Sequence, residues 1–525
     1  MTASHSTVPT VPLRLAGFGL FLVGFTIFVL TLTLGQFKLT PQIFEQAVSK
    51  PEHRQWLRPH IRDMFGVTYD TQVPFVADID AAIVKVNTAA GNDWQKKINT
   101  DYEAKDYKLS LARASSAGLI AGNKLLFFLL SIVLAAAGGL LYSLPKLSEE
   151  LPGIKNNGVF TEPATSGGWI GIAFALFLIL FYVFLYKAPE YITNWIALAD
   201  PASMVLNGHA ADRWFFYGLL YTTIILVMGV RMLVKYRHSS YQTVRTLSVM
   251  FFQTAFAFLI PQIMSVLGQP SMDLKNMWPL DYSFFFSYRL DTLIGSGQSG
   301  GIGLFLLGWG IVLFAVGVPV LTYFFGKRWY CSWVCGCGGL AETLGDPYRQ
   351  LSDKSLTAWR IERWLVHGVL VFAVVMTAIT LTNYLSNGKL LGDYTWRVQE
   401  AYGFYIGFIF AGAIGTGFYP VMGSRVWCRF GCPLAAYLGL VQRFKSRFRI
   451  TVNGGQCISC GNCSTYCEMG IDVRAYAQRG ENIVRSSCVG CGICAAVCPR
   501  GVLALENGPE EGRIIFKSSD VKILS

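Results

Sequence analysis

Long apolar runs alternate with polar connections along most of the chain. Eight runs reach or approach the roughly 20 residues that span a hydrocarbon core, near 15–34, 125–144, 169–186, 214–234, 248–268, 302–325, 364–385 and 403–422. This pattern predicts an all-α polytopic membrane bundle. The composition agrees, because 53% of the residues are hydrophobic and only 14% are charged, against about a quarter in ordinary globular chains.

Basic residues mark one side of the predicted bundle. They fill the loop 231–245, follow the sixth span at Lys327 and Arg328, and recur from Arg425 to Arg449 with no acid between. Loops with this bias face the cytoplasm, so we expect a multi-pass protein of the cytoplasmic (inner) membrane with both termini cytoplasmic. The same bias accounts for the net charge of +12 without nucleic acid as a partner. The run 15–34 is longer than the h-region of a signal peptide and is interpreted as a retained anchor.

The spans divide the chain into six predicted regions. These are an anchor helix (1–35), an extracytoplasmic, mostly helical domain (36–123), spans two to four (124–247), a tandem two-helix repeat (248–450), a ferredoxin domain (451–507) and a tail (508–525). In the extracytoplasmic domain, Thr40 and Asp93 are expected to cap two helices.

The repeat is visible in two short segments, "KRWYCSWVC" and "SRVWCRFGC". Each has an arginine, Arg328 or Arg425, three positions before a cysteine, and a second cysteine four positions after the first. Each follows a span that runs toward the basic side. Spans five to eight are therefore interpreted as two copies of a two-span unit in the same orientation.

All thirteen cysteines lie at or after Cys331, which favours thiolate ligands over a disulfide scaffold. Two runs, "CISCGNCSTYC" and "CVGCGICAAVCP", share the spacing C-x2-C-x2-C-x3-C of two-cluster bacterial ferredoxins, in which the fourth cysteine serves the other cluster. The predicted ligand sets are Cys457, Cys460, Cys463 and Cys498 for one [4Fe–4S] cluster, and Cys488, Cys491, Cys494 and Cys467 for the other. They predict a C-terminal α+β ferredoxin-like domain.

Two details of these runs lead to further expectations. Gly461, Gly490 and Gly492 are expected to let the backbone approach the clusters closely. Cys467 is followed by Glu468, and an acid beside a cluster should lower its potential. Zinc is the competing ligand for paired cysteines, although two complete runs with this spacing favour iron–sulfur clusters.

The cysteines of the repeat are a second candidate metal site. Residues four apart share a helix face, so Cys331 with Cys335, and Cys428 with Cys432, could present four thiols together at the membrane rim. A third [4Fe–4S] cluster is one interpretation; a redox-active dithiol or transient metal site and inert packing thiols are the alternatives. Cys337 has no counterpart in the second copy and is a bystander or substitute ligand. His367 lies in a span without a partner histidine and is interpreted as a packing residue rather than a haem ligand.

With these motifs the chain resembles the NosR/NapH-type membrane polyferredoxins, a group that includes the CcoG-like oxidase-assembly proteins. The resemblance covers about 249–507. The family motif C-x3-C-P is matched by Cys428, Cys432 and Pro433, whereas Gly336 replaces the proline after Cys335. The threonine motif that carries an external flavin in some members does not occur in 36–123.

The resemblance implies electron transfer at the membrane. The chain is expected to pass electrons between the quinone pool or a cytoplasmic donor and a respiratory partner enzyme, as a component rather than a stand-alone catalyst. A bound quinone is a candidate carrier across the membrane, and lipid is the expected surrounding. The alternatives are a metal (copper) handling or maturation factor and a redox-sensing regulator. The partner, the direction of electron flow and the oligomeric state stay open.

Overall fold

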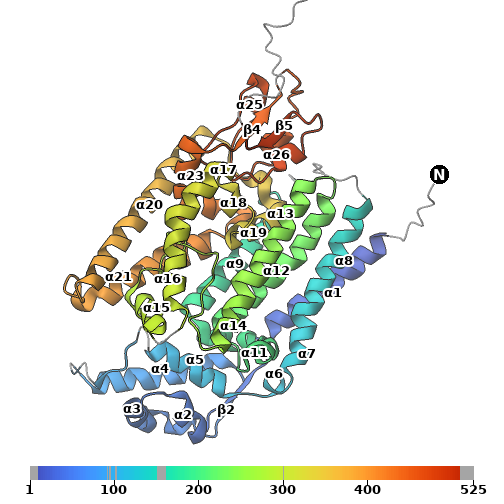
Figure 1. Ribbon diagram of the computed structural model, residues 1–525. Helices are drawn as coiled ribbons and strands as arrows, with labels where there is room; N and C mark the ends of the chain where they lie inside the picture. The colour runs from blue at the N-terminus through green and yellow to red at the C-terminus, as the bar shows by residue number, and fades with distance from the viewer. Residues whose placement is uncertain are drawn as a thin grey trace, which may run out of the picture. The chain divides into compact units, whose positions relative to one another are not determined.

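The computed structural model describes residues 10–91, 93, 96–100, 103–149, 161–298, 301–453 and 455–508. The protein is mostly helical and divides into two compact units, shown in Figure 1. Unit 1 comprises Met1–Lys146 and Val183–Leu220, and unit 2 comprises Leu147–Tyr182 and Tyr221–Ser525. The predicted tail lies outside the described residues beyond Gly508.

Within the described part of the chain, seven helices are long and apolar enough to cross a membrane. They are Val11–Leu30, Lys124–Glu149, Trp169–Lys187, Arg213–Lys235, Ser240–Val266, Gly303–Phe325 and Leu356–Leu385. The predicted eighth span, 403–422, is helical only over Gly403–Ile414 and Tyr419–Met422. Seven of the eight predicted spans are therefore continuous helices of membrane-spanning length.

Unit 1 holds the predicted anchor and the polar segment that follows it. Its helices are α1 (Thr10–Leu30), α2 (Pro41–Ala47), α3 (Pro51–Ile61), η1 (Arg62–Met64), α4 (Gln72–Ala89), α5 (Glu103–Ala114), α6 (Leu119–Gly122), α7 (Lys124–Phe128), η3 (Leu129–Val133), α8 (Leu134–Glu149), η4 (Pro189–Ile192), α10 (Thr193–Leu198) and α11 (Asp200–Asn207). A three-stranded antiparallel sheet, in the order β2 (Thr68–Tyr69), β1 (Gln36–Lys38), β3 (Ser116–Ala117), was not predicted.

The polar segment of unit 1 folds around its own apolar core. Phe37, Leu57 and Phe75 have no exposed surface and pack together with residues of α2 to α5. The predicted cap is confirmed at Thr40, whose hydroxyl accepts a hydrogen bond from the Ile43 amide at 3.3 Å. The helix α5 begins only at Glu103, and the cap at Asp93 stays a prediction because residues 94, 95, 101 and 102 lie outside the described residues.

Unit 2 holds all the cysteines. Its helices are α13 (Ser240–Phe251), η5 (Phe252–Leu259), α14 (Ile260–Val266), α15 (Ser287–Gln298), α16 (Gly303–Val312), η6 (Leu313–Gly317), α17 (Val318–Phe325), α18 (Arg328–Cys331), α19 (Gly336–Thr343), η7 (Asp346–Leu351), α20 (Leu356–Leu385), η8 (Gly392–Tyr394), α21 (Thr395–Tyr402), η9 (Gly403–Ile414), α22 (Tyr419–Met422), η10 (Trp427–Gly431), α23 (Pro433–Lys445), α24 (Asn462–Thr465), α25 (Val473–Arg479) and α26 (Ile493–Ala496). Helices α8, α9 (Trp169–Lys187) and α12 (Arg213–Lys235) contribute residues to both units.

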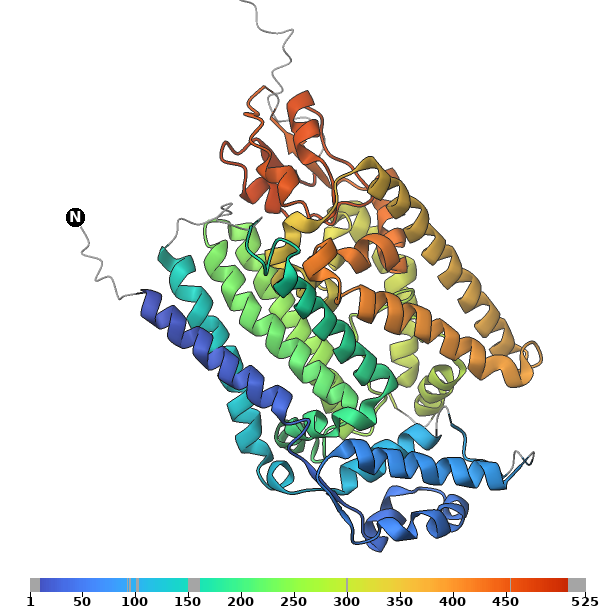
Figure 2. The same ribbon diagram turned by 180° about the vertical axis from the view of Figure 1, so that it is seen from behind.

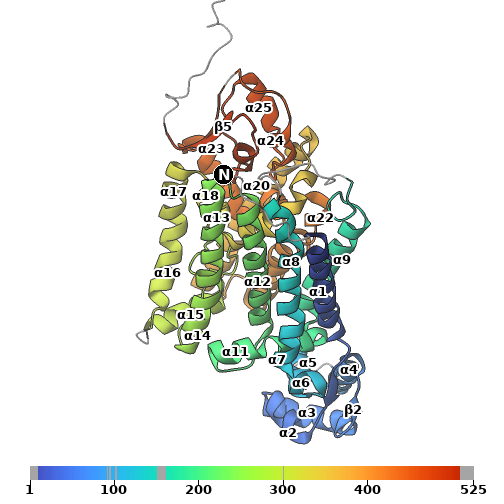
Figure 3. The same cartoon turned by 90° about the vertical axis from the view of Figure 1, so that its right-hand side faces the viewer.

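The C-terminal segment of unit 2 lies against one end of that unit's helices. Strands β4 (Arg449–Val452) and β5 (Leu503–Glu506) pair antiparallel, from Arg449 opposite Glu506 to Val452 opposite Leu503. Figures 1 and 3 show this red segment beyond the ends of α17 and α20. Figure 2 shows the long gold helix α20 beside the orange segment of α21 and η9. Unit 2 therefore combines an apolar helical part with a small cysteine-rich α+β part, as predicted.

Candidate metal centre

Four cysteines of the C-terminal segment face one cavity. Cys457, Cys460, Cys463 and Cys498 line a space of about 370 Å³, counted out to solvent. They are the set that the spacing predicts for one cluster. Gly461, between two of these cysteines, has a φ of 82°, a conformation that favours glycine. Cys460 is exposed, so this thiol set lies on the solvent side of the segment.

The other four ferredoxin cysteines lie deeper. The thiol of Cys494 has those of Cys488 and Cys467 as electrostatic neighbours, and the Cys491 sulfur lies within 4.8 Å of two buried carboxylates. Gly490 has a φ of 61°, and a Cβ atom there would come within 2.6 Å of Arg328. The glycine therefore also allows the cysteine loop to pack closely against the bundle, a role that the spacing of the cysteines did not predict.

Side chains of the helical part hold this loop along its length. Its carbonyls accept hydrogen bonds from Gln242 (to Cys491, 2.8 Å), Tyr241 (to Gly490, 2.7 Å), Ser332 (to Val489, 2.8 Å), Gln442 (to Cys488, 2.9 Å) and Lys327 (to Ser486, 3.1 Å). Because such buried carbonyls need donors, these bonds fix the second cysteine run on the bundle.

The four rim cysteines come together in the same unit. Cys331, Cys335, Cys428 and Cys432 are buried in one hydrophobic cluster, and the thiol of Cys432 has the other three as electrostatic neighbours. The expected shared helix face is wrong. Cys331 ends α18 and Cys335 precedes α19, while Cys428 lies in η10 and Cys432 caps α23. The four thiols are brought together by a break in the helix between the two cysteines of each pair.

A closely packed glycine and a fifth thiol adjoin the four rim cysteines. A Cβ atom on Gly338 would lie 2.0 Å from the Cys331 carbonyl oxygen, so only glycine fits there. Cys337 is hydrogen-bonded to Cys335, and this bond lowers the pKa of the Cys335 thiol to about 6. Burial raises the pKa of the Cys331 thiol to about 12. A neutral thiol at Cys331 becomes a thiolate readily only when a metal takes the place of its proton.

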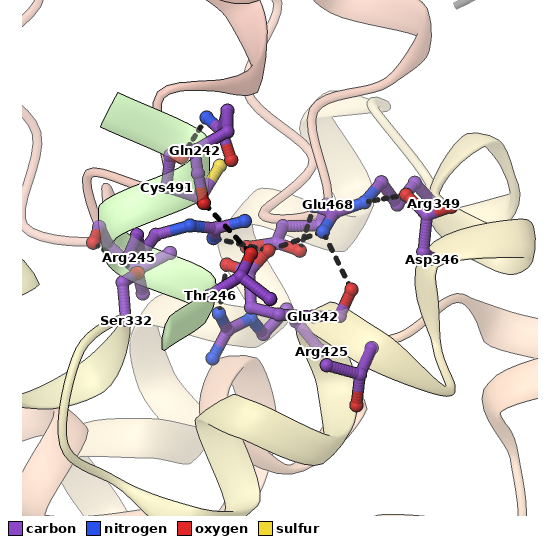
Figure 4. A network of polar contacts seen from close by, with 12 residues as sticks. Gln242, Arg245, Thr246, Ser332, Glu342, Asp346, Arg349, Arg425, Glu468 and Cys491 are labelled. Carbon is purple, nitrogen blue, oxygen red and sulfur yellow. Dashed lines mark hydrogen bonds and ion pairs between the residues drawn. The ribbon is translucent and has the colours of Figure 1, made fainter. Parts of the chain in front are cut away.

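A buried charge network lies between the rim segments and the ferredoxin cysteines, and Figure 4 shows its carboxylates and guanidinium groups. Arg425 donates to Glu342 at 2.5 Å and to Glu468 at 3.0 Å, and its Nη1 also donates to the Cys331 carbonyl at 3.1 Å and the Cys428 sulfur at 3.6 Å. Glu468 directly follows Cys467. A single guanidinium therefore touches both rim segments and the residue beside a ferredoxin cysteine.

Two further arginines neutralise the same carboxylates. Arg349 bonds to both Glu342 and Glu468, and Arg245 pairs with Glu342 at 2.5 Å. Burial alone would raise the pKa of the Glu342 carboxyl, but the three arginines hold that pKa far below its usual range. Glu468 is therefore paired with two guanidinium groups, and its expected effect on the potential of the neighbouring cluster stays a prediction.

The network extends away from the cysteines through Asp346. This carboxylate accepts from Arg349 at 3.0 Å, Tyr236 at 3.0 Å, Arg231 at 2.8 Å and Lys235 at 2.6 Å. Burial would raise the pKa of Asp346, but the charges of Lys235, Arg231 and Arg349 hold it well below the usual value. The network therefore contains more cationic side chains than carboxylates. Its net positive charge can stabilise anionic thiolates nearby.

One close group of ligand atoms combines a ferredoxin cysteine with two carboxylates. In the described chain, one trio of His, Cys, Asp or Glu ligand atoms lies within 4.8 Å of one another, namely Glu342, Glu468 and Cys491. Arginines already occupy its carboxylates.

Comparison with known families agrees with this chemistry. A family described as "4Fe-4S binding domain" matches residues 307–355 and 403–451, the two segments that carry the rim motifs. A second, described as "4Fe-4S dicluster domain", matches 456–503. The chain thus carries 4Fe–4S ferredoxin-type domains and is an iron–sulfur protein with seven candidate membrane-spanning helices. The number of clusters and their individual ligands stay predictions.

Three relatives extend the likeness. YccM of Escherichia coli (strain K12), named "Putative electron transport protein", is 28% identical over 157 residues, which cover 28% of this chain and 43% of YccM. The methylamine utilization ferredoxin-type protein MauN of Paracoccus denitrificans (strain Pd 1222) is 28% identical over 43% of this chain and 80% of MauN. MauN of Methylobacillus flagellatus is 26% identical over 28% of this chain and half of its own length. No solved structure matches the chain.

Proposed function

We propose that this protein is a membrane electron-transfer component of the NosR/NapH/CcoG type with three [4Fe–4S] clusters. Two are held by the predicted ferredoxin sets and the third by Cys331, Cys335, Cys428 and Cys432. The clusters supply one-electron transfer without proton chemistry of their own. The names of the relatives, "electron transport" and "ferredoxin-type", support this function.

The observation that carries the third site is the gathering of four buried thiols from two sequence repeats. Each thiol lies in the apolar cluster of unit 2, and both repeat segments match a 4Fe–4S family. Inert packing thiols would not require Gly338 to bring its backbone against the Cys331 carbonyl. Arg425 supports thiolates at this site, because a buried guanidinium that donates to sulfur favours the charged form.

The order of the thiol sets supports a relay. Arg425 and Glu468 join the rim set to the set containing Cys467, and the set with exposed Cys460 lies farther out. Fixed hydrogen bonds hold the middle set on the helices. A rigid and buried arrangement of this kind keeps the reorganisation energy small, which favours fast electron transfer.

The basic loops support cytoplasmic termini and a ferredoxin segment on the cytoplasmic side. Electrons would pass between the quinone pool or a cytoplasmic donor and a respiratory partner enzyme. A copper-handling role is the alternative from the family resemblance. Such a role would need exposed thioether ligands along an entry path, but Met264 and Met272 are buried in an apolar cluster with Phe284, as packing residues are.

The test compares Cys432→Ser with Cys337→Ser in anaerobically purified protein. Cys432→Ser should remove one set of electron paramagnetic resonance signals and about four irons per chain, whereas Cys337→Ser should keep them. Wild-type protein should also be reduced by a quinol analogue or by a low-potential soluble donor. A Cys432→Ser spectrum identical to that of the wild type would remove the third cluster, and stoichiometric copper would favour the alternative.

A further inference from the structure

A cationic cleft opens between the start of α20, the helix α23 and the loop before Cys488. Its volume is about 540 Å³, counted out to solvent. Five cations line it, together with one carboxylate, Glu362: Lys327, Arg363, Arg429, Arg443 and Arg485. The excess of positive charge needs an explanation, because the described carboxylates nearby do not balance it.

The floor of the cleft holds a guanidinium with an unused donor. Arg429 is only 3% exposed. Its Nε donates to Glu362 at 2.7 Å and its Nη1 to the Asp353 carbonyl at 2.7 Å, but its buried Nη2 has no acceptor. Leaving a buried charged donor unsatisfied is costly. The geometry of the site is therefore that of a receptor whose acceptor comes from outside the chain.

Lys327 also lies at the floor of the cleft, and its ammonium group has no carboxylate partner among the described residues. It is 2% exposed, and its ammonium donates to the Ser486 carbonyl at 3.1 Å. No salt bridge to it is found within the described residues. The positive charge of Lys327 can stabilise thiolates at Cys331 and Cys428, because it is close enough to act on both sulfurs. That explanation does not extend to the exposed arginines at the mouth.

The mouth of the cleft is built at the end of a candidate span. Arg363 and Arg485 lie over the ring of Trp359, at 5.2 and 5.1 Å from its centroid. Arg363 and Arg443 are exposed, and α20 continues from here as the apolar helix Leu356–Leu385. Stacking holds the guanidiniums of Arg363 and Arg485 near the opening, where a tetrahedral oxyanion can receive several donors at once.

We propose that this cleft binds a phosphate group, either the headgroup of an anionic phospholipid or a free phosphate. Guanidinium groups match phosphate oxygens in geometry and charge, and basic pockets beside membrane helices suit such headgroups. The unused Arg429 donor and Lys327 bind the innermost oxygens, while Arg363 and Arg443 bind the outer ones. Because Cys428 also lines the cleft, the bound anion lies beside the rim thiols.

The test uses the full iron-loaded chain and the double variant Arg363→Gln with Arg443→Gln. Both side chains are exposed, so the variant should fold. Arg447→Gln is the matched control, because Arg447 is an exposed arginine of the same basic stretch outside the cleft. Iron content confirms that each protein is intact.

Two arms separate the sources of phosphate. In the first, nanodiscs contain phosphatidylglycerol in phosphatidylcholine, and native mass spectrometry counts retained anionic lipid. In the second, discs of phosphatidylcholine alone are titrated with inorganic phosphate and followed by phosphorus NMR. We expect wild type and Arg447→Gln to bind alike in at least one arm, and affinity to fall about fivefold for each cleft arginine removed.

The pattern of responses decides the proposal. If the double variant retains less anionic lipid than the wild type, the ligand is a lipid headgroup. If it binds inorganic phosphate more weakly than the wild type, the ligand is a free phosphate. Equal binding by wild type and the double variant in both arms, or an equal loss in Arg447→Gln, overturns it. Arg429→Gln removes the arginine at the floor of the cleft and should also weaken phosphate binding. If that variant does not fold, the comparison of the wild type with the double variant still tests the proposal.

Discussion

Replacing Arg425 by glutamine tests the buried charge network most directly. The change removes ion pairs at 2.5 and 3.0 Å to Glu342 and Glu468, and the bond to the Cys428 sulfur. It leaves two buried carboxylates with one cation fewer. Removing one partner of a buried ion pair costs about 3–5 kcal/mol.

The internal repeat supplies the matched control. Arg328 occupies the same position in the first copy, but its guanidinium lies over the rings of Phe448 and Tyr241, at 4.8 and 5.7 Å. Losing these contacts in Arg328→Gln should cost about 0.5–2 kcal/mol. For a chain of 525 residues the melting temperature shifts by about 1 °C per kcal/mol. Thermal unfolding in detergent should therefore fall by roughly 3–5 °C for Arg425→Gln and roughly 0.5–2 °C for Arg328→Gln.

A double variant separates the loss of the ion pair from the other effects of replacing the Arg425 side chain. Adding Glu468→Gln to Arg425→Gln removes a carboxylate together with its cation, so the combined loss should be smaller than the sum of the single losses. Equal melting temperatures for Arg425→Gln and Arg328→Gln, or simple additivity in the double variant, would refute the ion-pair account of this region.

Two other predictions concern single residues. Gly338→Ala places a Cβ 2.0 Å from the Cys331 carbonyl, so it should destabilise the fold by about 1–3 kcal/mol or more and lower the iron content. Gly368→Ala, on α20 with open space around it, should stabilise the helix by up to about 1 kcal/mol; melting curves and iron assays compare them. Burial lowers the pKa of His53, so its stabilising contribution should be present above about pH 6.5 and decline as the pH falls toward 5. Protection factors from hydrogen–deuterium exchange, corrected for the slower intrinsic exchange at lower pH, should fall over 41–61 on acidification in the wild type and fall less in His53→Gln; equal falls would contradict this.

Much of the architecture follows from local patterns in the sequence. Apolar runs of sufficient length predicted seven helices that the structure contains, because a membrane span is defined by its own composition. The spacing of the ferredoxin cysteines also predicted which four would share the cavity that includes Cys498. Thr40 was recognised as a cap because the bond to Ile43 is local.

The non-local features were not predictable in the same way. The sheet of unit 1 uses strands of two or three residues, too short for an alternating pattern. Glu342 and Arg349 meet Arg425 and Glu468 only in the folded chain. The one available signal was an acid, Glu342, within the otherwise uncharged stretch after Cys337. Such an acid at a membrane rim indicates a buried cationic partner.

The measurement that tests the central claim most directly is the metal content of anaerobically purified protein, with iron, acid-labile sulfide, zinc and copper counted per chain. Three [4Fe–4S] clusters predict about twelve irons and about twelve sulfides, with zinc and copper absent. About eight of each would contradict a cluster at the rim cysteines. Zinc in place of iron and sulfide would contradict electron transfer altogether.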